Sequence, residues 1–131
     1  MKKIVKVVGA IIINEDDKIL CTLRNKNKSL GNMWEFPGGK IEPGETLEEA
    51  LKRELKEELE LNVNSLTFFT NVVKEYENFI IDLTCFKCKI LNNETYILKE
   101  HQAALWLNKE NLSSLVWVPT DYPVVENLMS E

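Results

Sequence analysis

The stretch from Gly39 to Leu61, which reads GKIEPGETLEEALKRELKEELEL, contains the most informative pattern in this chain. Its second half has the composition of a helix, and Glu54, Glu57 and Glu58 are spaced three and four residues apart. Side chains at this spacing share one helical face, where like charges repel by about a few tenths of a kcal/mol per pair. Two interpretations follow: a solvated acidic surface, or a site for a hard divalent cation such as Mg²⁺ or Mn²⁺.

Residues at fixed distances around these carboxylates favour the cation site. The fixed positions are Gly39, Glu45, Arg53, Glu54, Leu55, Glu57, Glu58 and Leu61. Their spacing resembles the signature of the Nudix hydrolases, G-x5-E-x7-R-E-U-x-E-E-x-G-U, in which U is aliphatic. One position departs, because Glu60 stands where the family has glycine. We expect Glu60 to be tolerated because the helix ends here without the left-handed residue that glycine normally supplies.

The resemblance extends over nearly the whole chain. The blocks that carry it are MKKIVKVVGAIII at the start, WEFPGGKIEPGE before the helix, KEHQAALWL (Lys99 to Leu107) and PTDYPVVENL (Pro119 to Leu128). They are similar to the MutT-type branch, whose members are described as 8-oxo-dGTP diphosphatases or CTP pyrophosphohydrolases. The resemblance implies a single Nudix domain over residues 1–131, folded as an α/β/α sandwich around a mixed sheet.

Composition limits the partners of this chain of 131 residues. Its formal net charge of −5 argues against binding to a nucleic acid polymer or an acidic membrane. The first residues lead into an apolar strand without a cleavage site, and no apolar run approaches the ~20 residues that span a bilayer. We therefore expect a cytoplasmic protein, either a monomer or a weak homodimer. Cys21, Cys85 and Cys88 are expected to be free thiols, with Cys85 and Cys88 on opposite faces of a strand.

The pattern of apolar residues predicts an α/β arrangement with helices on both faces of the sheet. We expect a helix over residues 46–60, with Thr46 and Glu49 forming a capping box. A second helix is expected over residues 121–129, with Asp121 as its N-cap. The predicted strands cover residues 4–13, 18–23, 34–36, 66–74 and 78–90, with shorter pieces at 98–107 and 115–118. A turn is expected over residues 37–39, and strands 4–13 and 18–23 should form a hairpin.

The resemblance assigns a metal site to the helix. The predicted ligands are Glu54, Glu57, Glu58, the more distant Glu100, and a backbone carbonyl of Gly38, with Gly39 as the alternative. Arg53 joins the glutamates in the catalytic set and is expected to pair with Glu45, anchoring the preceding loop. His101 adjoins Glu100, but neighbouring residues commonly point apart, so it is not assigned as the general base.

The resemblance also predicts residues that contact the substrate, namely Arg24, Glu35, Phe36, Phe79 and Asp121. Phe79 occupies a place where MutT-type enzymes have an arginine, so that contact is missing here. Asp121 falls where they have an asparagine that reads the base, and a carboxylate there could be protonated if it is buried. Its alternative role is that of a helix cap. Trp34 could stack on a nucleobase or belong to the core, and we interpret it as a core residue.

The implied activity is metal-dependent hydrolysis of a nucleoside triphosphate to the monophosphate and pyrophosphate. Candidate substrates are an oxidised nucleotide such as 8-oxo-dGTP, or CTP and dCTP, and either Glu54 or Glu100 could accept a proton from the attacking water. One alternative is a hydrolase of nucleoside diphosphate sugars or dinucleotides. The other is a regulatory domain that binds a nucleotide without cleaving it, which the presence of all the glutamates argues against.

Overall fold

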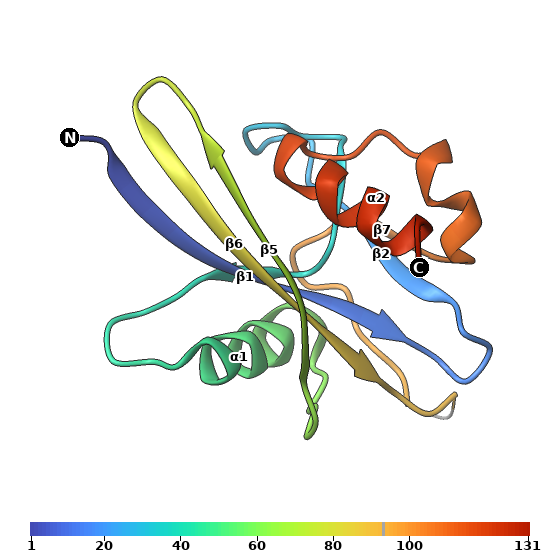
Figure 1. Cartoon of the computed structure of the whole chain (residues 1–131). Helices are drawn as coiled ribbons and strands as arrows, with labels where there is room; N and C mark the ends of the chain where they lie inside the picture. The colour runs from blue at the N-terminus through green and yellow to red at the C-terminus, as the bar shows by residue number, and fades with distance from the viewer. Residues whose placement is uncertain (93) are drawn as a thin grey trace.

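A computed structural model describes residues 1–92 and 94–131, in which seven strands form one mixed sheet flanked by helices (Figure 1). The strands are β1 (Lys3–Ile13), β2 (Ile19–Leu23), β3 (Trp34–Glu35), β4 (Gly38–Lys40), β5 (Thr67–Glu75), β6 (Phe79–Lys89) and β7 (Ala103–Leu107). The helices are α1 (Leu47–Leu59), α2 (Tyr122–Met129) and the short 3-10 helices η1 (Lys109–Ser114) and η2 (Pro119–Asp121). The predicted α/β fold is confirmed. None of the helices described here is long and apolar enough to cross a membrane.

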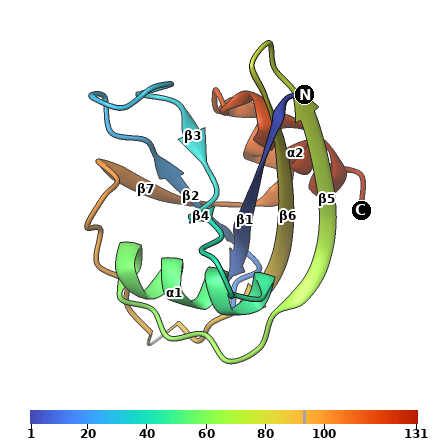
Figure 2. The same cartoon turned by 90° about the vertical axis from the view of Figure 1, so that its left-hand side faces the viewer.

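The sheet is built around β1. Strand β6 runs parallel to it along its whole length, and β5 continues the sheet antiparallel to β6. On the other side of β1, strand β4 pairs antiparallel with its middle, where Val8 lies opposite Gly39. Strand β2 joins β1 only at Ile13 and Ile19, and then pairs with β3 and β7. A parallel pair requires a crossover, and the connection from β1 to β6 includes α1; Figure 2 shows α1 and α2 on different sides of β1 and β6.

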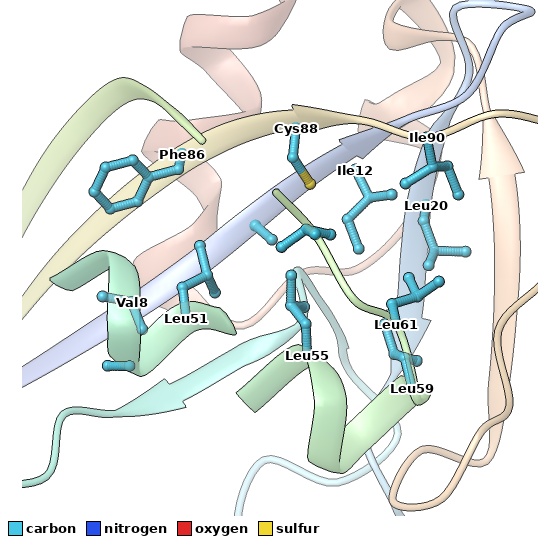
Figure 3. Packing of buried hydrophobic residues seen from close by; sticks show 13 residues of the cluster. Val8, Ile12, Leu20, Leu51, Leu55, Leu59, Leu61, Phe86, Cys88 and Ile90 are labelled. Atoms are coloured by element: carbon cyan, nitrogen blue, oxygen red, sulfur yellow. The ribbon is translucent and has the colours of Figure 1, made fainter. Parts of the chain in front are cut away.

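Two hydrophobic clusters hold the helices against the sheet. Successive strand residues point to opposite faces, so Val8 and Ile12 pack toward α1 whereas Ile11 packs toward α2. The α1 cluster contains an apolar stripe of that helix, with residues spaced three and four apart, seen in Figure 3 as Leu51, Leu55 and Leu59. Cys85 belongs to the α2 cluster and Cys88 to the α1 cluster, on opposite faces as predicted, and Cys21, Cys85 and Cys88 are free and buried.

Helix α1 begins as predicted. The Thr46 hydroxyl accepts a hydrogen bond from the Glu49 backbone N–H at 3.1 Å, and the Glu49 carboxylate accepts one from the Thr46 N–H at 2.9 Å. These reciprocal bonds satisfy two backbone donors that would otherwise lack partners at the first turn.

The end of α1 differs from the prediction. Glu60 is in the left-handed conformation, with φ 55° and ψ 31°, so the expectation that no left-handed residue is needed here is wrong. The reversal lets the Leu61 N–H reach the Leu55 carbonyl at 3.3 Å and places the Leu61 side chain in the α1 cluster. A residue with a Cβ therefore bears a conformational cost that glycine would avoid.

Some shorter elements also differ from their predictions. The expected turn at residues 37–39 includes the start of β4, because the backbone there pairs with β1. Residues 98–102 are not part of a strand, so β7 is shorter than expected. Residues 115–118 form no regular strand, and only Trp117 bridges to Trp34. These pairings join segments far apart in the chain, which local periodicity does not specify.

We predict that Glu60→Gly stabilises the fold by about 0.5–1 kcal/mol, because it removes the left-handed penalty of a residue with a Cβ. The lost ion pair between Glu60 and Lys99, at 3.3 Å, joins two exposed side chains and should matter little. Denaturant unfolding measures the change, with Glu60→Ala as the control that loses the carboxylate but keeps the strain. A glycine variant no more stable than the alanine variant would contradict this account.

Candidate active site

A cleft of about 790 Å³ lies beside α1, within the size range of small-molecule sites. Its walls come from β1, β4, β6, α1, η2 and the segments after β2 and before β7. The carboxylates that line it are Glu35, Glu54, Glu58, Glu100 and Asp121. The cationic side chains that line it are Lys3, Arg24, Lys28 and Lys40. Apolar side chains of β1 and β6, such as Val5 and Ile81, also line the cleft, which thus combines charged and apolar surface.

Helix α1 presents Glu54 and Glu58 to the cleft while its apolar stripe is buried against the sheet. Glu58 is only 4% exposed. Gly39 leaves room for the Glu54 carboxyl group, since a Cβ at this position would lie 2.5 Å from Glu54 Cδ. Gly38 must also lack a side chain, because a Cβ there would overlap the Val8 carbonyl oxygen. The glycine pair therefore lets the β4 backbone lie close to both β1 and the ligand face of α1.

The end of α1 also brings the more distant residues into the site. The last carbonyl groups of a helix have no partner within the helix. Here the Lys99 N–H donates to the Glu58 carbonyl at 3.1 Å, and the Ile97 N–H donates to the Leu59 carbonyl at 2.9 Å. These bonds hold the segment before β7 against the helix. As a result Glu100, the predicted distal ligand, faces the same cleft as Glu54 and Glu58.

Glu58 carries the strongest electrostatic perturbation of the acidic region. Burial raises the pKa of its carboxyl group well above the ordinary value, and the neighbouring carboxyl groups of Glu54, Glu100 and Glu35 raise it further. Its Oε2 atom is buried and has no hydrogen-bond partner. A buried carboxylate among like charges needs a cation or a proton. The oxygen-rich donor set fits a hard divalent cation such as Mg²⁺ or Mn²⁺.

The positive charge of Arg53 offsets the negative charge of neighbouring glutamates. It donates to the Glu45 carboxylate at 2.6 and 3.0 Å, so the predicted pair is confirmed. Arg53 also lies 2.8 Å from Glu54 Oε1 and 3.3 Å from Glu57 Oε2, and the Glu57 side chain is 54% exposed. Among the described residues, no group of three potential ligand side chains is arranged as a cation site.

His101 is a site residue to which the sequence analysis gave no role. Its side chain is 4% exposed, and Nε2 lies 2.9 Å from Glu35 Oε2 and 3.8 Å from Glu58 Oε1. An Nε2–H can donate to the Glu35 carboxylate, which leaves the buried Nδ1 without a partner. The available signal was its place beside Glu100, but orientation depends on how residues 97–99 dock on α1.

Glu35 connects His101 to Arg24 within the cleft. Arg24 Nη1 lies 3.1 Å from Glu35 Oε1, so His101 and Arg24 bind separate oxygens of one carboxylate. Arg24 also donates from Nε to the Ser29 carbonyl at 2.9 Å. The predicted substrate residues Arg24 and Glu35 are thus brought together, and each is oriented by the other.

Asp121 is buried beside Phe36 and occupies the predicted N-cap position of α2. Its side chain makes no capping hydrogen bond, because Asp121 Oδ2 accepts instead from the Phe36 N–H at 2.9 Å. Its backbone is already helical, with φ −87° and ψ −16°, because η2 precedes α2. Burial raises the pKa of Asp121 to about 7, assisted by Glu35 and opposed by the Phe36 N–H and Arg24.

Aromatic residues form other parts of the cleft and its support. The Phe36 ring is buried and stacks on Trp117 with centroids 4.6 Å apart, so this predicted substrate residue also has a packing role. Phe79 lines the cleft and stacks on Tyr76 with centroids 5.0 Å apart. Trp34 packs against the α2 cluster, which confirms its predicted core position.

Comparison with known proteins agrees with this geometry. The model of the NUDIX domain matches residues 3–128. The chain is 34% identical to CTP pyrophosphohydrolase of Escherichia coli, over 98% of this chain and 93% of that protein. It is 35% identical to 8-oxo-dGTP diphosphatase of the same species, over 98% of each chain.

A solved structure supports the same relationship. The solution structure of the MutT protein from methicillin-resistant Staphylococcus aureus 252 has a TM-score of 0.74 and 44% sequence identity, covering 99% of this chain and 98% of that chain. Both the sequence and the arrangement of strands and helices therefore match along almost the full length. The chain belongs to the Nudix hydrolase family, in its MutT-type branch.

Proposed function

We propose that this protein hydrolyses nucleoside triphosphates to the monophosphate and pyrophosphate, removing unwanted nucleotides from the cytoplasmic pool. The observation that carries the proposal is the buried Glu58 carboxyl group, with an unpartnered oxygen, among Glu54, Glu100 and Glu35 at one end of a nucleotide-sized cleft. Nudix hydrolases generally need a divalent metal ion, and we propose Mg²⁺, with Mn²⁺ as a substitute. The names of the two Escherichia coli relatives make 8-oxo-dGTP and CTP the first nucleotides to test.

The residues of the cleft divide into two groups by chemistry. Glu54, Glu58, Glu100 and the Gly38 carbonyl, all from residues that line the cleft, would hold the cation, together with Glu57, which lies outside the lining and is 54% exposed. When bound, the cation would neutralise phosphate charge and activate water. Glu54 or Glu100 would take the proton of the attacking water. Arg53 would act as a positioning residue, since it already holds Glu54 and Glu57.

The nucleoside is proposed to occupy the rest of the cleft. Val5, Ile81 and Phe79 offer an apolar surface there, and Asp121 offers a buried carboxyl group to the edge of a base. Arg24 and Glu35 would fix the base or sugar. We therefore propose a small nucleotide as the ligand of this cleft. We propose that the protein acts as a monomer or a weak homodimer.

The test is a substrate panel assayed with Mg²⁺. It should include ordinary and oxidised deoxynucleotides, CTP, nucleoside diphosphate sugars and dinucleotides, with the products identified by chromatography. Pyrophosphate and a monophosphate from a nucleoside triphosphate are the expected products. Preferential cleavage of a sugar nucleotide or dinucleotide would overturn the substrate class, and nucleotide binding without cleavage would make the chain a regulatory domain.

Glu58→Gln and Glu57→Gln are each expected to lower kcat by about 10³-fold, because either change removes a proposed anionic ligand of the catalytic ion. Steady-state kinetics with the preferred nucleotide measures the effect. Glu48→Gln is the matched control, since Glu48 is an exposed residue of the first turn of α1 that does not line the cleft. Near-wild-type turnover in both test variants would remove these glutamates from the metal site.

Asp121→Asn is expected to change the ratio of kcat/KM between 8-oxo-dGTP and CTP by about ten-fold, because a buried group that bonds the wrong base edge leaves polar atoms unpaired. The kcat for the better substrate should change much less. The measurement is kcat and KM of wild type and Asp121→Asn for 8-oxo-dGTP and for CTP. An unchanged ratio would reduce Asp121 to a structural partner of the Phe36 N–H.

The same variant should alter the dependence of stability on pH. Because the pKa of Asp121 rises from 3.8 to about 7 on folding, the folded chain binds more protons than the unfolded chain between these values. The contribution of Asp121 to stability is therefore lost as pH increases from about 4 to about 7. The unfolding temperature of Asp121→Asn relative to wild type should increase between these two pH values and stay constant at higher pH. A difference between the two proteins that does not change with pH would contradict the raised pKa.

A further inference from the structure

Leu30 combines a strained backbone with an exposed apolar side chain. Its φ is 56°, in the left-handed region that a bulky residue rarely adopts. The residue is 46% exposed and belongs to neither of the two hydrophobic clusters. Neither conformational preference nor burial in the core therefore favours leucine at this position. What the structure does offer Leu30 is a place in the wall of the catalytic cleft.

The loop that carries Leu30 is held in place by hydrogen bonds at its base. The Arg24 N–H donates to the Met33 carbonyl at 2.9 Å, and the Asn32 N–H donates to the Arg24 carbonyl at 3.1 Å. Gln102 donates to the Asn32 side chain at 2.6 Å, which ties the loop to the segment before β7. Gly31 fits only without a side chain, because a Cβ there would lie 2.6 Å from the Lys26 carbonyl oxygen.

We infer that Leu30 is a substrate-binding residue that contacts the nucleoside part of the substrate. The phosphates would bind beside the cation held by Glu54, Glu58 and Glu100. An apolar side chain makes no favourable contact with these charged groups. The base and sugar present apolar surface. Burying this surface against Leu30 removes the apolar atoms of the nucleoside and of the leucine from water. Strain retained at a ligand-contacting position is the pattern expected of a functional residue. This inference rests on the proposed function.

The test compares Leu30→Gly and Leu30→Asn with a control of the same backbone type. Glycine and asparagine tolerate the left-handed conformation, so neither variant adds strain: Leu30→Gly removes the side chain, and Leu30→Asn replaces it with a polar one. Asp17→Gly is the matched control: Asp17 has φ 59°, is exposed in the turn between β1 and β2, and does not line the cleft. Each protein is assayed for thermal unfolding, for kinetics with 8-oxo-dGTP and CTP, and for inhibition by pyrophosphate and by the nucleoside monophosphates dGMP and CMP.

We expect both Leu30 variants to unfold at the wild-type temperature or above, and to raise KM for the preferred nucleotide about five-fold or more. Inhibition by its monophosphate should weaken by a similar factor while inhibition by pyrophosphate is unchanged, and Asp17→Gly should leave all kinetic values at wild type. Unchanged KM in both Leu30 variants, equal weakening of pyrophosphate inhibition, or clearly lower unfolding temperatures in both would overturn the role of Leu30. A wild-type protein that hydrolyses no nucleoside triphosphate would instead overturn the proposed function, and this inference with it.

Discussion

The central constraint on this molecule is the burial of one carboxyl group among others. Glu58 is held at the edge of the α1 cluster by the helix that also carries Glu54, and Glu100 and Glu35 reach the same place from other elements. Two like charges in a medium of low dielectric repel strongly, and a buried carboxylate lacks the water that would screen it. The fold must therefore keep Glu58 protonated or supply a cation, and a cation bound there would let an acidic protein bind a polyphosphate.

The rest of the site follows from how α1 is attached. Its apolar stripe fixes the rotation of the helix on the sheet, which directs the carboxylates toward the cleft. Its C-terminal carbonyl groups bind residues 97–99, which places Glu100 and His101 beside Glu58. Arg53 joins the helix to the preceding loop through Glu45 and to β4 through the Lys40 carbonyl. Packing, capping and the proposed metal site thus depend on the same thirteen-residue helix.

Local patterns predicted the parts of the site that lie on that helix. The capping box of Thr46 and Glu49, the apolar stripe and the pair of Arg53 with Glu45 depend on spacings of three to eight residues, which the sequence displays directly. The left-handed Glu60 was predicted wrongly, because the missing family glycine was interpreted as a missing left-handed residue; the chain keeps that conformation with glutamate, and Leu61 is buried in the α1 cluster. Similarity of the sequence to a family could assign residues to the site but could not orient them.

The sequence alone could not predict the contacts between segments that are distant along the chain. His101 meets Glu35 across 66 positions of the chain, and Asp121 meets the Phe36 N–H across 85. Neither contact has a local signature, and a polar residue at the start of a helix is ordinarily a cap. The strained Leu30 is likewise visible only once the loop after β2 is placed beside the cleft.

Thermal unfolding of wild type and Glu58→Gln, each with EDTA or with Mg²⁺ at pH 8, tests most directly whether Glu58 is an uncompensated acid that requires a cation. With EDTA, the variant should unfold about 2–5 °C above wild type, because it no longer buries an acid among carboxylates. Added Mg²⁺ should raise the midpoint of wild type by about 2 °C or more and that of the variant much less, since a ligand stabilises only the state that binds it. A variant less stable than wild type in EDTA, or equal stabilisation of both proteins by Mg²⁺, would contradict the account.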